Sequence, residues 1–190
     1  VEGDYIYNQI TDAEGGIKKT YYDEIGRVYK ELDDGTNVDI EDKSIESFYT
    51  YDNVGRLIKK EFNDNTILQN VYDDKGYLIA EKYFEDEAAY LIDDFSDYNN
   101  YLYDTRGNML ESSGINGGTR EFEYNWSYDK YNNVIMVTEN GEYDTLDFAT
   151  SQMLYTYKNN GQLKSIKYPG HKTLLYEYDG YGRLEEVIRQ

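Results

Sequence analysis

The sequence predicts an all-β fold, an antiparallel β-hairpin meander that is twisted or rolled into an open barrel or shell fragment. Three observations predict it. A short sequence of Tyr, Asp, two further residues, Gly, a basic or polar residue and an aliphatic residue occurs seven times with some variation. Aromatic residues before many of the copies stand two apart. The shortest step between successive copies is 21 residues, which is the length of two strands and two turns.

Each copy predicts a hairpin turn. Asp accepts hydrogen bonds from backbone N–H groups two residues further on, and Gly takes a left-handed conformation without steric cost. In the copy at 128–134, Asn132 stands where Gly is expected, and Asn is the next most tolerant residue of that conformation. The residues assigned to turns are Asp23, Gly26, Asp52, Gly55, Asp73, Gly76, Asp104, Gly107, Asp129, Asn132, Gly161, Asp179 and Gly182. A weaker eighth copy at 11–17 keeps only the Asp and the Gly.

The segments on both sides of these turns predict strands. Aromatic side chains two apart lie on one face of a strand, and they occur here as Tyr49/Tyr51, Tyr101/Tyr103, Trp126/Tyr128, Tyr155/Tyr157 and Tyr176/Tyr178. Runs of strand length that mix polar and apolar residues follow the turns, for example at 56–62 and 163–168. These segments predict about fourteen to sixteen strands.

The units longer than 21 residues indicate insertions. We expect the extra residues near 33–46, 85–99, 112–120 and 139–152, at the strand ends opposite the Asp-Gly turns. One rim of the sheet is then uniform and the other carries inserted loops, which are common binding elements in repeat proteins. The segment 87–92 predicts a short helix. The copies run through the whole chain, so a single domain over residues 1–190 is expected.

Composition limits the partners of this chain. It has 38 acidic and 19 basic residues, a formal net charge of −19. Nucleic acid and anionic membrane surfaces are therefore disfavoured, because binding them relies on Lys and Arg. No apolar run approaches the length of a membrane span, and direct membrane insertion is not expected. The 24 Tyr residues suit a thin sheet with at least one wet face.

Residues for chemistry are sparse. His171 is the only histidine and lies in the turn-like segment 169–172, where a solvated loop residue is expected. There is no Cys, no Gly-x-Ser-x-Gly sequence and no nucleotide fingerprint, so neither an enzyme nor a cofactor is predicted. Acidic clusters at 33–34, 41–42, 85–87 and 93–94 offer oxygen ligands for Ca²⁺. None has the spacing of a known calcium loop, so a solvated acidic surface is favoured over a calcium site, and no metal is predicted.

The copies at 51–57 and 178–184 match every fixed position of the YD repeat, also called the Rhs repeat, which the chain resembles from about residue 11 to 190. The resemblance implies arrays of antiparallel β-hairpins, which in Rhs and teneurin proteins coil into a hollow shell. It also implies secreted, surface or envelope proteins, for which carbohydrate binding is often proposed. Two departures are visible. Eight or fewer copies are too few to close a shell, and the Asp-Pro-rich self-cleavage motif is absent, Pro169 being the only proline. The chain looks similar to short, acidic, Tyr-rich members from Bacteroides-like envelopes.

These observations lead to three functional hypotheses. The first is a non-enzymatic, extracellular or cell-envelope binding or scaffold module that recognises carbohydrate or another surface protein, with a leader removed before Val1. Its candidate ligand-binding residues are Trp126, Tyr101, Tyr103, Tyr128, Tyr155 and Tyr157. Cross-strand packing is the alternative role of these aromatic residues. The second hypothesis is a fragment of an Rhs-type toxin-delivery shell, and the third is a polysaccharide hydrolase with two facing carboxylates.

Overall fold

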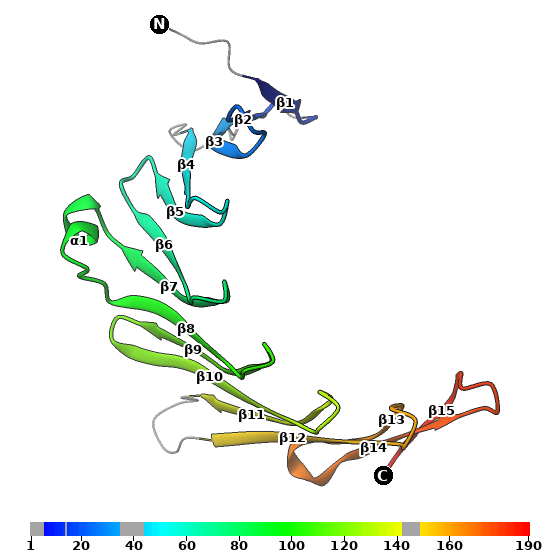
Figure 1. The fold of residues 1–190 in the computed structure, drawn as a ribbon. Coiled ribbons are helices and arrows are strands. Elements are labelled where there is room, and N and C mark those ends of the chain that lie inside the picture. Colours follow the sequence, from blue (N-terminus) through cyan, green and yellow to red (C-terminus); the bar gives the residue numbers. More distant parts are fainter. Residues whose placement is uncertain (1–5, 14, 35–43, 142–148) are drawn as a thin grey trace, which may run out of the picture. The chain divides into compact units, whose positions relative to one another are not determined.

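The computed structural model describes residues 6–13, 15–34, 44–141 and 149–190. Within these ranges the chain forms one sheet of fifteen strands, and the strand order in the sheet is the order in the chain (Figure 1). Neighbouring strands pair antiparallel, as in β4–β5 and β14–β15. The predicted all-β antiparallel meander is therefore confirmed.

The chain divides into two compact units. Unit 1 comprises Val1–Tyr72 and Ala80–Asp97, and unit 2 comprises Asp73–Ile79 and Tyr98–Gln190. Unit 1 contains β1 (Tyr7–Thr11), β2 (Ile17–Tyr22), β3 (Val28–Asp34), β4 (Ile45–Tyr51), β5 (Leu57–Phe62), β6 (Ile67–Tyr72) and the helix α1 (Glu87–Leu91). β7 (Leu78–Phe84) and β8 (Asp97–Tyr103) contribute residues to both units. Unit 2 contains β9 (Met109–Asn116), β10 (Thr119–Tyr128), β11 (Val134–Gly141), β12 (Ala149–Tyr157), β13 (Leu163–Lys167), the 3₁₀ turn η1 (Pro169–His171), β14 (Thr173–Tyr178) and β15 (Leu184–Arg189).

The repeated Asp-Gly sequences form the turns that follow even-numbered strands. In the turn after β4, the N–H of Asp52 bonds to the carbonyl of Arg56 at 2.9 Å, and the N–H of Gly55 bonds to the carbonyl of Asp52 at 3.0 Å. Gly55 has a φ of 89°, and Asn132 in the corresponding position has 68°. This is the pattern of a β-turn closed by a left-handed residue, which shifts the strand register beside it. We call the strand ends that carry these turns the uniform rim.

The opposite ends, which we call the variable rim, hold the insertions. The predicted short helix is α1, which Asp86 caps by accepting a hydrogen bond from the N–H of Ala89 at 2.8 Å. In the region 112–120 the extra residues lengthen β9 and β10, which meet at a turn containing Gly117 and Gly118, and so they do not form a separate loop. The other two expected insertions lie partly outside the described residues, at 35–43 and 142–148.

The eighth copy also forms a turn, but on the variable rim. The N–H of Asp12 bonds to the carbonyl of Gly16 at 2.9 Å, and Gly15 has a φ of 92°. This turn follows β1, an odd-numbered strand. Gly15 and Gly26 are 11 residues apart, about half of the 21-residue unit. That spacing is what one strand requires, and it explains why this copy is out of phase with the other seven.

Most strand residues are only half-buried. Among the described residues, the buried hydrophobic side chains are Ile67 and Phe84, both in unit 1. Phe84 makes edge-on ring contacts with Tyr90 of α1 at 5.3 Å and with Phe95 at 5.7 Å. α1 therefore packs against this small core through Tyr90. In the described ranges no helix is long and apolar enough to cross a membrane.

Candidate functional site

The repeated Asp accepts hydrogen bonds from the backbone of its own turn, and in five copies both of its carboxylate oxygens are used. Asp52 Oδ1 accepts from the N–H groups of Val54 and Arg56 at 3.0 and 2.9 Å, and its Oδ2 accepts from Arg56 Nε at 2.6 Å. Asp23 with Arg27, and Asp179 with Arg183, repeat this arrangement. The Nδ2 atoms of Asn108 and Asn133 replace the guanidinium at Asp104 and Asp129. Since both carboxylate oxygens are used, these Asp residues act as local structural acceptors.

The same contacts shift the titration of these carboxyls. The side-chain hydrogen bonds of Asn108 and Asn133 lower the pKa values of Asp104 and Asp129, and the backbone N–H bonds of the two turns add to the effect. At Asp179 the backbone and side-chain hydrogen bonds of Arg183 lower the pKa. Hydrogen bonds to an ionised carboxylate favour its charged form. The hydrogen bonds of these turns are therefore strongest when the Asp carboxyls are ionised.

A cation on one turn covers the ring of the next repeat's Tyr. The guanidinium carbon of Arg27 lies 4.8 Å from the Tyr51 ring centroid, and that of Arg56 lies 4.6 Å from the Tyr72 centroid. Lys158 Nζ takes the same position over Tyr178 at 4.9 Å. Each contact is a cation–π interaction that joins neighbouring repeats.

In five of the copies the Tyr also donates a hydrogen bond to the repeat before it. The acceptor is the carbonyl of the aliphatic residue that ends the previous copy of the sequence. The five bonds, 2.7 to 3.0 Å long, are Tyr51 to Val28, Tyr72 to Leu57, Tyr128 to Met109, Tyr157 to Val134 and Tyr178 to Leu163. Tyr, Asp, Gly, the basic residue and the aliphatic residue of the repeat therefore all serve contacts within the sheet.

Strand register places the predicted ligand-binding aromatics of unit 2 on one face of the sheet. Tyr101 lies opposite Ser112, and Ser112 lies opposite Tyr124. Trp126 lies two residues beyond Tyr124 and opposite Val137, which in turn lies opposite Met153. Because residues two apart share a face, Tyr103, Tyr128, Tyr155 and Tyr157 are on this face as well. We call these side chains the aromatic face, and all six predicted residues are half-buried.

The predicted residues of the aromatic face contact different neighbours. Trp126 packs against Tyr124 with ring centroids 5.9 Å apart, and Tyr103 stacks on Tyr77 at 5.0 Å. The hydroxyls of Tyr128 and Tyr157 are engaged with backbone carbonyls, as described above. Packing thus occupies part of the Trp126 and Tyr103 rings. Their role as ligand contacts stays a prediction.

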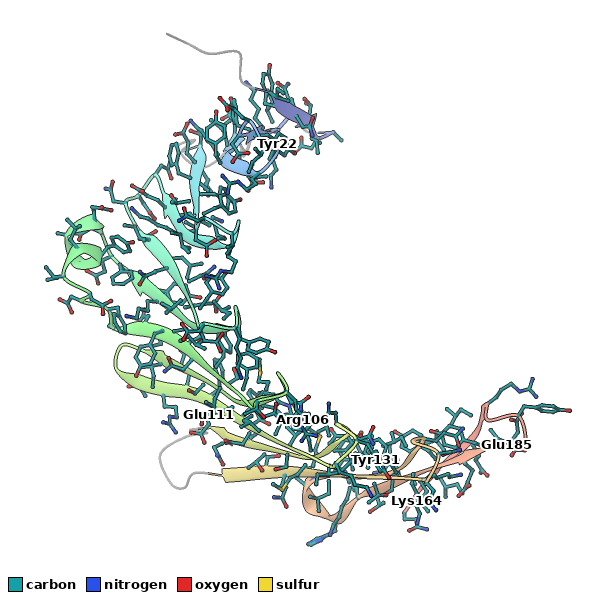
Figure 2. All side chains as sticks on the ribbon, in the orientation of Figure 1. Tyr22, Arg106, Glu111, Tyr131, Lys164 and Glu185 are labelled. Carbon is teal, nitrogen blue, oxygen red and sulfur yellow. The ribbon has the colours of Figure 1, made fainter. Side chains whose placement is uncertain are left out.

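A groove of about 740 Å³ brings two of the predicted residues together beside the uniform rim of unit 2. Tyr155 and Tyr157 line it, and Tyr131 at the tip of the turn after β10 also lines it, with 73% of its surface exposed. Figure 2 shows Tyr131 and Arg106 at the turns of this rim. Tyr131 is not among the residues predicted from the sequence. Its position between Asp129 and Asn132 could have identified it, because the third residue of such a turn points away from the sheet.

Polar groups line the same groove. They come from Asp129, Asn133, Thr156 and the segment 158–160. Lys158 pairs with Glu177 at 3.3 Å, and Asn160 Nδ2 donates to Gln162 Oε1 at 2.7 Å. The groove therefore combines aromatic rings with amides and a hydroxyl, which is the chemistry of a site for a polar, hydroxylated ligand.

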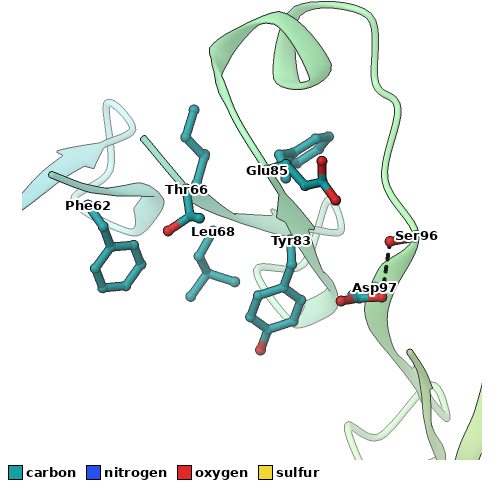
Figure 3. A pocket seen from close by; sticks show the side chains of 9 residues that line it. Phe62, Thr66, Leu68, Tyr83, Glu85, Ser96 and Asp97 are labelled. Atoms are coloured by element: carbon teal, nitrogen blue, oxygen red, sulfur yellow. Dashed lines mark hydrogen bonds between the residues drawn. The ribbon is translucent and has the colours of Figure 1, made fainter. Parts of the chain in front are cut away.

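A second pocket, of about 290 Å³, lies in unit 1 beside the small core (Figure 3). Its apolar lining includes Phe62, Leu68 and Tyr83, and two carboxylates, Glu85 and Asp97, lie at its edge. Asp97 accepts a hydrogen bond from Ser96 at 3.1 Å. Glu85 and Asp97 are thus two acids that line a common pocket, and the hydrolase hypothesis stays a prediction.

The acidic clusters enter ion pairs around α1. Lys59 Nζ lies 2.9 Å from Glu87 Oε2, and Lys82 Nζ lies 2.8 Å from Asp93 Oδ1. The described residues contain no group of three or more His, Asp or Glu side chains placed to hold a metal ion. Glu41 and Asp42 lie outside the described residues. His171 is exposed, in the turn between β13 and β14, with a φ of 70°.

Comparison with known proteins bears on the fold. No family model and no curated protein matches the chain. A chain in the crystal structure of TcdB2-TccC3-Cdc42 matches 95% of this chain with 18% identity and a TM-score of 0.69. The Photorhabdus luminescens Tc holotoxin pore with a mutated TccC3 matches 94% with 17% identity and a TM-score of 0.64.

The fold is Rhs-like. This chain spans about one tenth of the length of those Tc toxin chains. At such low identity the likeness concerns the fold alone. The Rhs-like fold agrees with the meander and its turn periodicity, which are visible in the sequence.

Proposed function

We propose that this chain is a non-enzymatic scaffold segment of a secreted or cell-surface protein with an Rhs-like, shell-forming architecture. The observation that carries the proposal is the use of the repeat's own side chains. The Tyr hydroxyls bond to the carbonyls of the preceding repeat, and the Asp carboxylates bond to their own turns. A repeat whose Tyr and Asp side chains are used in this way specifies a regular sheet. The likeness to Tc toxin chains supports a delivery shell as the setting.

Electron cryo-microscopy of the product of the complete gene tests this proposal. The expected result is a hollow particle with this sheet in its wall. A particle that carries the sheet as an isolated module, with no enclosed volume, would contradict the shell and leave the binding module as the better description.

A second candidate function is carbohydrate recognition in the groove that contains Tyr131, Tyr155 and Tyr157. It is favoured by the exposed ring of Tyr131 next to the amides of Asn133 and Asn159. Aromatic rings with nearby convergent polar groups suit a sugar, which has both apolar ring faces and hydroxyls.

A glycan array with the purified chain tests the second candidate, with Tyr131→Ala as the site variant. Tyr181→Ala is the matched control, because Tyr181 occupies the same turn position, is 89% exposed and lies outside the groove lining. We expect saturable binding that Tyr131→Ala abolishes and Tyr181→Ala preserves. Equal loss in both variants, or binding unaffected by either, would remove the groove as the site.

A further inference from the structure

The pocket of about 290 Å³ in unit 1 has an apolar side built by three neighbouring strands. Phe62 ends β5, and Leu68 of β6 lies opposite Lys60, two residues before Phe62, so Phe62 and Leu68 share one face of the sheet. Figure 3 shows the Tyr83 side chain of β7 projecting to the same side. Tyr83 is 43% exposed. These strands therefore offer an aliphatic side chain and two rings that a ligand can contact.

The other side of this pocket is acidic. Glu85 follows directly after β7, and Asp97 begins β8. Both line the pocket together with Ser96, whose hydroxyl donates to Asp97 Oδ1 at 3.1 Å. Among the described residues that line it, none is Lys, Arg or His. The pocket therefore combines apolar groups on one side with negatively charged hydrogen-bond acceptors on the other.

Glu85 differs from two acids near α1 because it has no cation of its own. Glu87 pairs with Lys59 at 2.9 Å, and Asp93 pairs with Lys82 at 2.8 Å. Glu85 forms no ion pair with any other residue that the structure describes. A cavity with apolar walls and charge of one sign concentrates the electric field and attracts the opposite charge from solution. A ligand for this pocket is therefore expected to be a cation.

The volume of the pocket limits the size of that ligand. A space of 290 Å³ corresponds to about ten water molecules. It is at the lower end of the range of small-molecule sites. One aromatic ring with a short side chain fits such a space, whereas the backbone of a peptide or a chain of sugar units does not.

Contacts of the required kind already occur beside this pocket. Lys60 Nζ lies 4.6 Å from the centroid of the Phe62 ring. Lys82 Nζ lies 4.3 Å from the centroid of the Phe95 ring and at the same time pairs with Asp93. An alkylammonium group is attracted both to the face of an aromatic ring and to a carboxylate. An amine from solution would make the same two contacts in the pocket.

From this combination we propose that the unit 1 pocket binds a small primary amine with an aromatic or branched apolar body. The ammonium group binds the carboxylates of Glu85 and Asp97. The apolar body lies against Phe62, Leu68 and Tyr83. The inference concerns unit 1 alone, and it depends neither on a shell nor on glycan binding in unit 2.

Phenethylamine is the probe, because it joins one phenyl ring to one primary ammonium group. Phenethyl alcohol is the matched neutral ligand, since a hydroxyl of similar size replaces the ammonium. Each is titrated into the isotope-labelled full chain, and the signals of Leu68, Glu85 and Ser96 are followed by NMR. We expect saturable shifts at these residues with a dissociation constant of about 1 mM for the amine. The alcohol should bind about tenfold more weakly.

Glu85→Gln is the site variant. It keeps the shape of the side chain and removes its charge, so it should weaken phenethylamine binding about tenfold and leave phenethyl alcohol binding unchanged. Asp94→Asn is the matched control, because Asp94 is an exposed acid between α1 and β8 that lies outside the pocket lining. It also removes one negative charge, and it should bind the amine as the native chain does.

Leu68→Ala tests the apolar side of the pocket. It should weaken binding of the amine and of the alcohol alike, about fivefold, because both ligands lose apolar contact. Circular dichroism checks that the variant keeps the sheet.

Four results would overturn the proposal. They are equal affinity for the amine and the alcohol, equal weakening by Glu85→Gln and Asp94→Asn, shifts that map away from the pocket, and no shift at about 20 mM amine. Tighter binding of trilysine than of phenethylamine would also overturn it, because the acids would then attract positive charge without the apolar side of the pocket.

Discussion

Tyr51 donates its phenolic hydrogen to the backbone carbonyl of Val28 over a distance of 2.7 Å, across 23 residues of sequence. The paired ladder between β3 and β4 extends from Asp33 and Ile45 to Lys30 and Phe48, so Val28 lies beyond its last pair. The side chain thereby satisfies a carbonyl that the ladder does not reach. An unmade bond to a carbonyl shielded from water is costly, so this bond favours one position of the repeat at 51–57 on the repeat before it.

Replacing Tyr51 with Phe should lower the free energy of unfolding by about 1 kcal/mol, the usual net value of one such hydrogen bond. Tyr72→Phe should cost less, because the Leu57 carbonyl still accepts from Asn70 Nδ2. Urea unfolding of the two variants, followed by circular dichroism, measures the difference. If Tyr72→Phe is the more damaging of the two, the hydroxyl bond is not the main contribution of these residues.

The strands and turns can be predicted from the sequence, but these long-range contacts cannot. Asp and Gly at fixed spacing predict a turn because the causes are local, and Glu87-Ala88-Ala89 similarly predicts α1. The Tyr51 to Val28 bond depends on the register of β3 against β4, which lies across the insertion at 33–46. Local patterns do not determine that register.

The candidate site was also predictable only in part, because local patterns do not determine contacts between hairpins. Period two places Tyr155 and Tyr157 on one face of a strand. It does not place Tyr131, from the neighbouring hairpin, in the same groove. Nor does it reveal that the Tyr157 hydroxyl bonds to the Val134 carbonyl, which changes the interpretation of that Tyr from ligand contact towards sheet contact.

Gly55→Ala should destabilise the sheet by about 1–2 kcal/mol, because a Cβ is unfavourable in the left-handed conformation. No atom lies within 4 Å of the added Cβ, so the cost is that of the backbone alone. Gly55→Asn should recover part of the loss, since Asn132 adopts this conformation naturally. Thermal unfolding compares the variants.

Gly180→Ala is the matched control for that series. Gly180 lies in the corresponding turn after β14 but without a positive φ, and its added Cβ also meets no atom within 4 Å. We expect a neutral effect or a stabilisation of about 0.4–1 kcal/mol through the unfolded chain. A loss equal to that of Gly55→Ala would show that the turns resist any side chain, irrespective of φ.

Acid should weaken the turns through Asp104 and Asp129, whose pKa values are lowered in the folded chain by hydrogen bonds from Asn108 and Asn133. A lowered folded pKa gives stability that is present above the ordinary Asp pKa of about 3.9 and is lost as pH falls through the folded value. The stability difference between the native chain and Asp129→Asn should therefore shrink from about pH 6 to about pH 3. A difference that does not change with pH would mean that the charge of Asp129 contributes nothing.

Alkali should unfold the sheet through its tyrosines. Desolvation raises the pKa values of Tyr51, Tyr128 and Tyr157, and the hydroxyls of all three are donors to backbone carbonyls. A raised folded pKa gives stability that is complete below the ordinary Tyr pKa of about 10 and is lost as pH rises through the folded value. Ionisation would also remove the hydrogen that each hydroxyl donates.

Tyrosinate absorbance and circular dichroism should therefore change together above about pH 10. In Tyr51→Phe one of these groups is absent, so the pH dependence should be less steep, whereas full ionisation with an intact sheet would show that the hydroxyl bonds are dispensable.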